Sequence, residues 1–342
     1  MRLSAPAYAI AVLLGVVALM ASVIASIGLG AVDLASADVW RALFDPSGVD
    51  PVVAQIVREL RLPRALLGAS VGAALAVTGA SLQAVMRSNL ADPYVLGVSS
   101  GASIGAAIAV VTGAEHLLGG TGLMALSYAA AVGGVSVVLA IARVGGRVHA
   151  TRLLLAGAAF SAFAGSVTGL LLYLVPEASA LRGLVFWLLG GLGGADWALL
   201  AWTGTSTLVG VTALLALARW QNLLLLGDEA AQTLGLEVMQ ARVIIVLVAA
   251  LMVGATVASA GAIGFVGLVV PHAMRPWTGP DHRRLIPASA IAGGLLLLWM
   301  DVIARLALAP RELPVGVLTG LVGAPVFLAI LRRSGGDGDG RG

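Results

Sequence analysis

Residues 5–31 read APAYAIAVLLGVVALMASVIASIGLGA, and residues 285–300 read LIPASAIAGGLLLLWM. Neither stretch carries a charge, and a helix needs about 20 apolar residues to cross a bilayer. Only helices and closed barrels satisfy every backbone N–H and C=O group in hydrocarbon. Because the apolar runs are continuous and do not alternate with period two, barrel strands are excluded. These stretches predict an all-α integral membrane protein.

The composition of the whole chain leads to the same fold class. Apolar residues make up 59% of the sequence and charged residues only 11%, too few to cover a soluble globule of this size. Cysteine is absent, which excludes disulfides, thiolate metal sites and cysteine nucleophiles. The sequence pI is 9.9, but the arginines lie between apolar runs and form no single patch. They indicate membrane topology and contact with lipid, and argue against nucleic-acid binding.

Nine stretches are long enough to be spans. A short apolar piece, residues 261–271, brings the total to about ten transmembrane helices. Gly and Ala abound inside them, which lets helices approach closely. The nine predicted spans are Pro6–Leu29, Arg64–Val85, Tyr94–Val111, Gly122–Ala142, Leu153–Val175, Trp197–Leu217, Val243–Ala260, Ile286–Ala304 and Val315–Leu331.

Ten crossings put both termini on one side, and arginine placement identifies that side. With both termini inside, thirteen of the twenty arginines fall on the cytoplasmic side, as the positive-inside rule requires. The first span could instead be a cleaved signal peptide, because Arg2 precedes it and Ala35-Ser36-Ala37 follows, although its apolar run exceeds the roughly 7–15 residues of a signal core. We therefore expect one permease domain over residues 1–333 and a disordered, Gly/Asp-rich cytoplasmic tail over residues 334–342.

One cytoplasmic loop, between Arg219 and Arg242, is longer than the others. Asp228 and Glu229 suit a helix N-terminus, where carboxylates meet unpaired N–H groups. Gly235 is a plausible residue to end that helix. The sequence thus predicts a helix of about two turns, either a surface helix without a partner or a knob on which a cytosolic motor pushes.

Arginines on the outer side run against the positive-inside bias. The sequence Arg58-Glu59-Leu60-Arg61-Leu62-Pro63-Arg64 precedes the second span, and Arg305 and Arg311 flank an outer loop that contains Glu312. Guanidinium groups pair with carboxylates through two hydrogen bonds, so docking of an acidic soluble partner is one reading. Headgroup contact or an internal pair with Glu59 is the other.

Ionisable residues near the bilayer fall at the predicted span ends. Asp301 and Arg305 are four residues apart, which favours an intrahelical pair. With no acidic or histidine row along a span centre, we expect no resident metal, no proton relay and no bare-ion channel. No hydrolase motif and no phosphate-binding G-x-x-x-x-G-K-[ST] loop occurs, so we expect no enzyme activity, and any ATPase must be a separate chain.

Several motifs occur in a fixed order over most of the chain, from about Arg61 to Arg333. They are Arg61–Arg64 (RLPR), Gly79–Gln83 (GASLQ), Leu90–Pro93 (LADP), Leu96–Ala102 (LGVSSGA), Phe186–Gly191 (FWLLGG), Leu226-Gly227, Leu234–Leu236 (LGL), Gly261–His272 (GAIGFVGLVVPH) and Glu312–Val317 (ELPVGV). In these motifs the chain resembles the permeases of iron-siderophore, haem and cobalamin importers, a class of bacterial ATP-binding-cassette transporter.

The resemblance implies an assembly in the bacterial inner membrane. It consists of a homodimer of ten-helix subunits with the pathway at the dimer axis, two cytosolic ATPase subunits that bind ATP and magnesium, and a periplasmic binding protein. The cargo is a large metal chelate, and this chain itself holds no cofactor. Ferric siderophore, haem and cobalamin all remain open as the cargo.

The resemblance also assigns roles to individual residues. The outer arginines Arg61, Arg64 and Arg305 resemble those that meet the binding protein, and Ser88, Leu90, Ala150 and Thr151 resemble the cytoplasmic gate. The family's Arg-Asn-Pro-Leu-Ala reads here Arg87-Ser88-Asn89-Leu90-Ala91, so a proline that restrains the backbone is missing. The segment that resembles the coupling helix, which seats in the ATPase, consists of Gly227, Asp228, Glu229, Ala230, Ala231, Gln232, Thr233, Leu234, Gly235 and Leu236.

We therefore expect the transmembrane subunit of an ATP-driven importer that works by alternating access. Two other readings stay open on residue chemistry alone. One is a secondary carrier or channel that works without an ATPase, and the other is a membrane scaffold that transports nothing.

Overall fold

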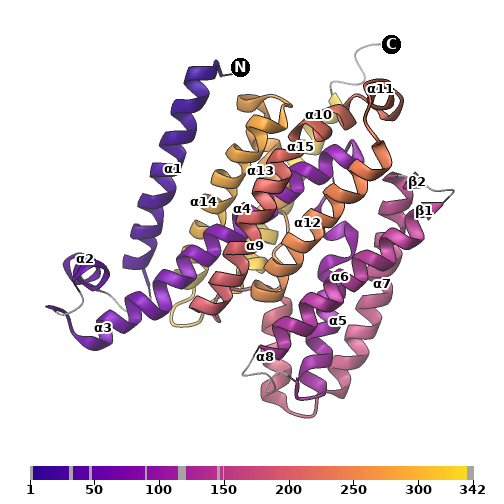
Figure 1. The fold of residues 1–342 in the computed structure, drawn as a ribbon. Helices are drawn as coiled ribbons and strands as arrows, with labels where there is room; N and C mark the ends of the chain where they lie inside the picture. The colour runs from indigo at the N-terminus through magenta and orange to yellow at the C-terminus, as the bar shows by residue number, and fades with distance from the viewer. Residues whose placement is uncertain are drawn as a thin grey trace.

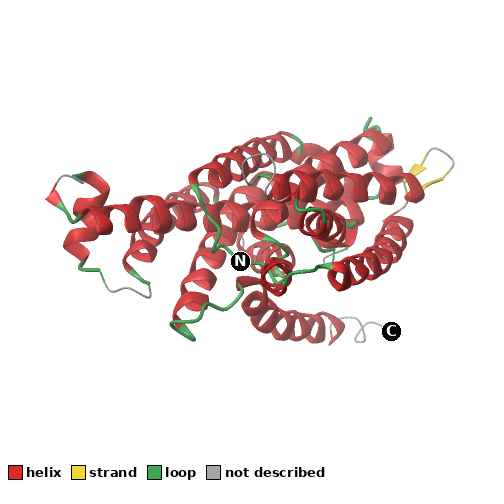
Figure 2. Cartoon of the chain, turned by 90° about the horizontal axis from the view of Figure 1, so that it is seen from below, coloured by secondary structure: helices red, strands yellow, loops and turns green. Residues whose placement is uncertain are grey.

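The computed structural model describes residues 3–30, 34–45, 48–88, 91–114, 121–144, 147–148 and 150–336. In this part of the chain the fold is a bundle of helices (Figures 1 and 2). Seven helices are long and apolar enough to cross a membrane, and three shorter apolar helices accompany them. The expected all-α membrane fold is confirmed.

The seven long helices are α1 (Ala5–Gly28), α4 (Leu62–Met86), α6 (Gly122–Ala142), α7 (Ala150–Leu174), α9 (Trp197–Ala216), α12 (Val238–Ala260) and α14 (His282–Leu306). Helix α15 (Val315–Gly336) is one of the three shorter apolar helices, with its apolar part over Val315–Ala329. The shorter elements are α2 (Ser36–Phe44), α3 (Pro51–Gln55), the π-helix η2 (Ile56–Arg61), the 3₁₀-helix η3 (Pro93–Leu96), α5 (Val98–Val111), α8 (Ala178–Leu188), α10 (Ala218–Leu225), α11 (Asp228–Thr233) and α13 (Val266–Thr278). Strands β1 (Arg143–Val144) and β2 (Arg147–Val148) pair as a small antiparallel hairpin.

Each of the nine predicted long spans contains a helix, but several observed bounds differ from the predicted ones. The third span begins at Val98, because Asp92 caps the separate helix η3 and Gly97 then adopts a positive φ of 78°. The short piece at residues 261–271 is not one helix: residues 261–265 are irregular, and α13 runs through Pro271 to Thr278. Helix α15 extends to Gly336, into the tail expected from residue 334, and residues 337–342 lie outside the described part.

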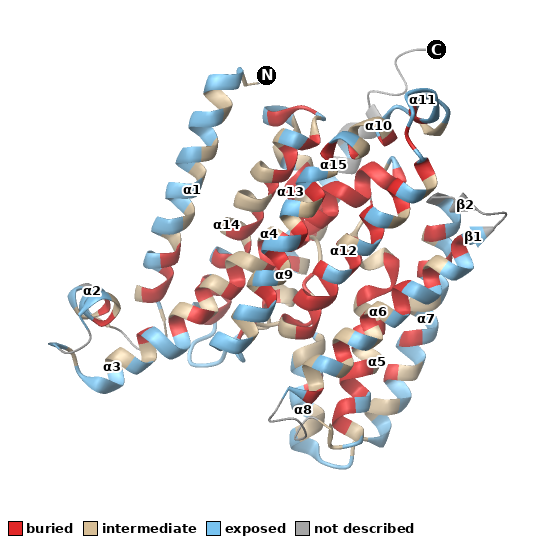
Figure 3. Cartoon of the chain, in the orientation of Figure 1, coloured by how far each residue is buried: buried red, intermediate tan, exposed pale blue. Residues whose placement is uncertain are grey.

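Helix α4 forms the centre of the bundle and contacts α14, α9, α13 and α12 (Figure 3). Its small residues let other backbones come close. A Cβ atom on Gly72 would overlap the carbonyl oxygen of Gly293 in α14, and one on Gly79 would overlap that of Gly267 in α13. Glycine at these positions therefore brings α4 into backbone contact with both neighbours.

Helices α5 and α6 pack against each other in the same way. A Cβ atom on Gly105 would overlap the carbonyl oxygen of Leu126, so only glycine permits this approach. The pair, with α7 and α8, forms the part of the bundle farthest from α1 (Figure 1).

The two ends of the bundle differ in what they carry. The start of α1 lies beside the start of α14, where the Tyr8 hydroxyl donates to the carbonyl oxygen of Arg284 at 2.8 Å. Figure 1 shows α10, α11 and the end of α15 at this same end, and α2 and α3 at the opposite one. Both described ends of the chain thus lie on one side, the cytoplasmic end; the other is called the outer end.

Candidate functional site

The predicted cytoplasmic knob is present as helix α11, between Gly227 and Leu234. Its C-terminus ends in a Schellman motif: Leu236 N–H donates to Ala231 O and Gly235 N–H to Gln232 O, both at 2.9 Å, with Gly235 at a φ of 82°. Gly227 precedes the helix at a φ of 103°, which only glycine adopts without strain. Two glycine turns therefore fix the direction of a helix of less than two turns.

An ion pair holds α11 to the start of α12. The guanidinium of Arg242 reaches both carboxylate oxygens of Asp228, at 2.9 and 3.3 Å, and Arg242 is only 5% exposed. Ala231 is fully buried on the same side of α11. The opposite side is open, and the exposed fractions of Leu226 and Leu234 are 62% and 57%. The knob is thus held by this ion pair and by the buried Ala231, and it leaves Leu226 and Leu234 exposed just before and just after α11.

The start of the knob lies against the end of α4. A Cβ atom on Gly227 would stand 3.3 Å from Nη1 of Arg87. Arg87 ends α4 in the left-handed region, at a φ of 50°, and the next residue, Ser88, donates its N–H to Gln83 O at 3.1 Å. The knob therefore contacts the residue that positions Ser88, one of the predicted gate residues.

A polar network joins α10 to α14 and α4 at the cytoplasmic end. Asn222 donates from Nδ2 to Asp281 at 2.7 Å and accepts from the His282 backbone N–H at 2.9 Å. The ring of His282 reaches back to Ala80 O in α4, with Nε2 at 3.2 Å. The network therefore ties α10 to the start of α14 and, through His282, to α4.

Asp281 caps α14 in this network, and its carboxylate accepts the Arg283 backbone N–H at 3.0 Å. Burial would raise the pKa of Asp281, but the hydrogen bonds from Asn222 and Arg283 and the positive charges of Arg283 and His282 lower it on balance. The cap thus stays ionised near neutral pH and keeps its partners.

At the outer end, Arg64 lies between two carboxylates. It makes bidentate contacts with Asp301 at 2.9–3.1 Å and with Glu312 at 2.9 and 3.1 Å. Arg305 pairs with Asp301 at 3.1 Å, so the predicted intrahelical pair is confirmed. Asp301 is 3% exposed. This outer ion cluster, formed by Arg64, Asp301, Arg305 and Glu312, ties α4 to α14 and to the segment before α15.

Arg61 and Arg305 are directed to the end of α1. Arg61 donates to Ile27 O at 2.8 Å, and Arg305 donates to Leu29 O at 2.9 Å. Both arginines are less than 10% exposed. On this side the exposed arginines of the described residues are instead Arg41, Arg58, Arg182 and Arg311. The three arginines predicted to dock a binding protein thus each have contacts inside the chain, and docking stays a prediction.

The predicted gate is only partly within the described residues. Ser88 is half-buried after α4 and Thr151 is exposed in the first turn of α7, which begins at Ala150. Leu90 lies outside the described residues. A gate at these positions remains a prediction.

The FecCD transport family matches residues 18–333. The chain belongs to the FecCD transport family. Among its relatives, the haemin transport system permease HmuU of Yersinia pestis is 39% identical over 320 residues, which are 90% of this chain and 91% of that protein. The cobalamin import system permease BtuC of Halobacterium salinarum is 42% identical over 83% of this chain and 75% of that protein.

A solved structure agrees with this family membership. An inward-facing metal-chelate type ABC transporter superposes with a TM-score of 0.82 at 29% identity, covering 94% of this chain and 98% of that one. As a member of this family, the chain is a multi-pass membrane transport protein.

Several residues of the cytoplasmic end could not be identified from sequence. Asn222 lies about 60 residues before the adjacent Asp281 and His282, so only folding brings the three together. Arg87 gave no signal, because its left-handed backbone is unusual for a residue other than glycine. The one available signal was Asp281, which follows Gly279-Pro280 and precedes an apolar run, as a helix cap does.

Proposed function

We propose that this chain is the transmembrane subunit of an ATP-driven importer that carries a large metal chelate into a bacterial cell across the inner membrane. The observation that carries the proposal is the contact of the α11 knob with Arg87, next to Ser88. A motor that moves the knob would act directly on the end of α4. The names of the relatives and of the similar solved structure support the chelate class.

In this mechanism the knob transmits force along two routes. Through Arg87 it acts on the segment that holds Ser88, and through Asp228 and Arg242 it acts on α12. The Asn222–Asp281–His282 network makes α14 move with α10. Ser88, Leu90, Ala150 and Thr151 would form the gate that these movements open, between small and apolar side chains that offer the chelate no strong ligand.

The proposed assembly supplies the parts that this sequence lacks. Two ATPase subunits bind ATP and magnesium, two copies of this chain form the pathway, and a periplasmic binding protein delivers the chelate. Beside the knob, an open hollow of about 410 Å³ is lined by Gln232, Gly235, Leu236, Glu237, Val238 and Met239, and offers the ATPase a second contact. Seating the exposed Leu226 and Leu234 in the ATPase would bury apolar surface.

The decisive experiment measures ATP hydrolysis by the complex reconstituted in lipid, with the binding protein loaded in turn with cobalamin, haem or a ferric siderophore. We expect one chelate to stimulate hydrolysis. Asp228→Asn, which breaks the ion pair of the knob, should reduce stimulation, whereas Asp228→Glu, which keeps a carboxylate for Arg242, should retain more of it. Transport by the chain alone, driven by an ion gradient, would instead favour a secondary carrier, and purification without any ATPase or binding protein would favour a scaffold.

Docking at the outer end is tested separately. Charge reversal of Arg61 and Arg64 together should weaken binding-protein affinity, and an unchanged affinity would refute their role. Because these side chains also hold α1 and the outer ion cluster, the melting temperature of each variant must be measured beside its affinity. Reversal of the exposed Arg58 and Arg311 is the matched comparison, since it changes the same charge without breaking these described contacts.

A further inference from the structure

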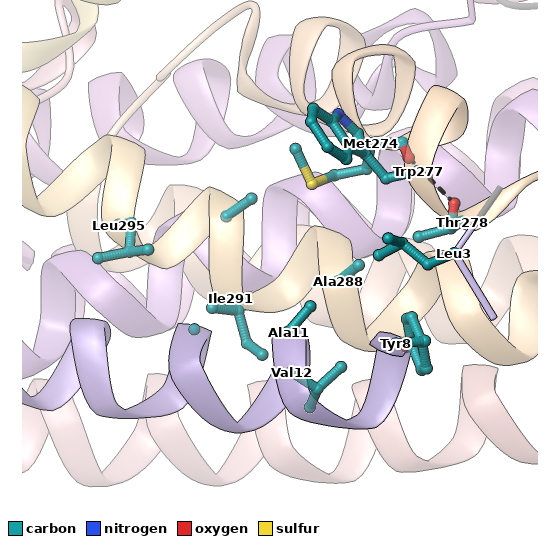
Figure 4. Close-up of a pocket in the computed structure, with 12 residues that line it drawn as sticks. Leu3, Tyr8, Ala11, Val12, Met274, Trp277, Thr278, Ala288, Ile291 and Leu295 are labelled. Atoms are coloured by element: carbon teal, nitrogen blue, oxygen red, sulfur yellow. Dashed lines mark hydrogen bonds between the residues drawn. The ribbon is translucent and has the colours of Figure 1, made fainter. Parts of the chain in front are cut away.

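An apolar cleft of about 240 Å³ separates the first half of α1 from α13 and α14. Figure 4 shows Ala11 and Val12 of α1 facing Ala288 and Ile291 of α14, with Met274 and Trp277 at one end. Gly15 lines the deeper part, where a Cβ atom would stand 3.0 Å from Ile291 Cγ2. The cleft is therefore a narrow apolar groove between the helices, and it runs along α1 from the cytoplasmic end.

The bilayer surrounds this cleft. On the other sides of α1, Ile10, Leu13, Leu14 and Val17 are 57–64% exposed, so this helix faces lipid along its length. An apolar space behind a single lipid-facing helix is accessible to acyl chains and to no water-soluble partner. Its occupant must then come from the membrane.

The mouth of the cleft carries the side chains that recognise a lipid headgroup. Trp277 is 56% exposed, and Trp and Tyr favour the membrane–water interface. Arg284 lies one helical turn before the cleft-lining Ala288, donates to Leu3 O at 3.0 Å and lies over the ring of Tyr8, 5.4 Å from its centroid, and the residue before it, Arg283, is exposed. Within the described residues neither guanidinium forms an ion pair.

The nearest carboxylate is already engaged in other contacts. Asp281 accepts from Asn222 and from the backbone N–H of Arg283, at 2.7 and 3.0 Å. The start of α14, beside the mouth, thus holds two arginine charges against one carboxylate. Such basic sites between transmembrane helices on the cytoplasmic side suit anionic lipid headgroups.

We propose that this cleft binds an anionic glycerophospholipid of the cytoplasmic leaflet, with one acyl chain between α1 and α14 and the phosphate at Arg283 and Arg284. The lipid fills the space between α1 and the bundle and fastens the helix that is otherwise least packed. This site is independent of the proposed chelate transport.

The test measures lipid retained by the full chain in mild detergent, by native mass spectrometry with added dioleoyl phosphatidylglycerol or dioleoyl phosphatidylcholine. We expect phosphatidylglycerol to bind more tightly. Arg283→Gln with Arg284→Gln should weaken it roughly 25-fold, at about 5-fold for each arginine near a membrane surface. Arg219→Gln, an exposed arginine at the same end but outside the cleft, should change nothing.

Two further variants separate binding from folding. Arg283→Lys with Arg284→Lys keeps the charges and should retain phosphatidylglycerol binding. Ala288→Phe fills the cleft and should reduce the binding of both lipids. Equal affinity for the two lipids, or phosphatidylglycerol binding that survives both the glutamine variants and Ala288→Phe, would overturn the proposal. Binding of inorganic phosphate alone, with no dependence on Ala288, would overturn the acyl-chain part.

Discussion

Helices α1 and α4 are both apolar membrane helices, yet the bundle uses them in opposite ways. The most apolar window of α1 has a mean hydropathy of 2.7 and is 17% buried, whereas the most apolar window of the continuous helical stretch Pro51–Met86, which contains α4, has a mean hydropathy of 1.7 and is 78% buried. In a bilayer the more hydrophobic helix is the one that faces lipid. Burial follows small residues, because lipid tails are as apolar as the protein core.

The two helices are also held by different contacts. Helix α4 meets its neighbours backbone to backbone at Gly72 and Gly79. Helix α1 is fastened by polar contacts near its two ends: Arg61 and Arg305 at the outer end, and Tyr8 at the cytoplasmic end. The packing of α4 in the centre of the bundle thus depends on close backbone contacts at glycines, whereas the attachment of α1 at the periphery depends on a few hydrogen bonds.

The largest effect should come from Asp301→Ala, which removes the carboxylate shared by the outer ion cluster. Arg305 and Arg64 would then be largely buried with fewer partners, and unfolding should become easier by about 3–5 kcal/mol. Denaturant titration in detergent measures this. Asp38→Ala is the control, since Asp38 and Arg41 are exposed and 4.0 Å apart, and should cost about 0.5 kcal/mol or less. Equal losses in both variants would contradict the role of the cluster.

Next in size, Gly79→Ala should separate α4 from α13 and cost about 3 kcal/mol, because the new methyl group would overlap a backbone oxygen that side-chain motion cannot relieve. The same titration checks it. Gly169→Ala in α7, where the added Cβ meets nothing within 4 Å, should leave stability equal or slightly higher. If both variants were equally stable, the close approach of α4 would not matter for stability.

Arg61→Met should release the outer end of α1 while sparing the centre of the bundle. Loss of hydrogen bonds from a charged donor to Ile27 O and Gly28 O should cost about 1.5–3 kcal/mol. Hydrogen exchange followed by mass spectrometry should show faster exchange near Ile27 and unchanged exchange in α4. Faster exchange throughout both helices would mean that α1 is not separately attached.

The smallest effect is expected on the lipid face of α1. Leu14→Ala should change stability by less than about 0.5 kcal/mol, because lipid replaces the lost contacts, whereas Leu75→Ala in α4, at 2% exposure, should cost about 2–5 kcal/mol. A large loss at Leu14 would place that side chain against a protein partner.

Hydropathy identified where the helices lie but not which of them are buried. Every long span was predictable because about 20 apolar residues suffice to mark it. The short elements α2, α8 and α10 were not predicted, since none reaches that length. The close approach of Gly79 to Gly267 depends on folding across more than 180 residues, which no local pattern records.

The candidate site was predictable where its chemistry is local. Asp228, Glu229 and Gly235 marked the ends of α11, because helix caps and left-handed turns depend on the types of residues that are adjacent in sequence. The outer arginines were harder, since the acceptors of Arg61 are backbone carbonyl oxygens and carry no residue signature.

Helix α5 also bears on how the protein is made. Its 14 residues rise about 21 Å, short of the roughly 30 Å hydrocarbon core, so it cannot enter a membrane as a stable unit by itself. The close contact with α6 at Gly105 lets the two helices pack as a pair, which is long enough to be stable in the membrane. We expect α5 and α6 to enter the lipid together, as a hairpin.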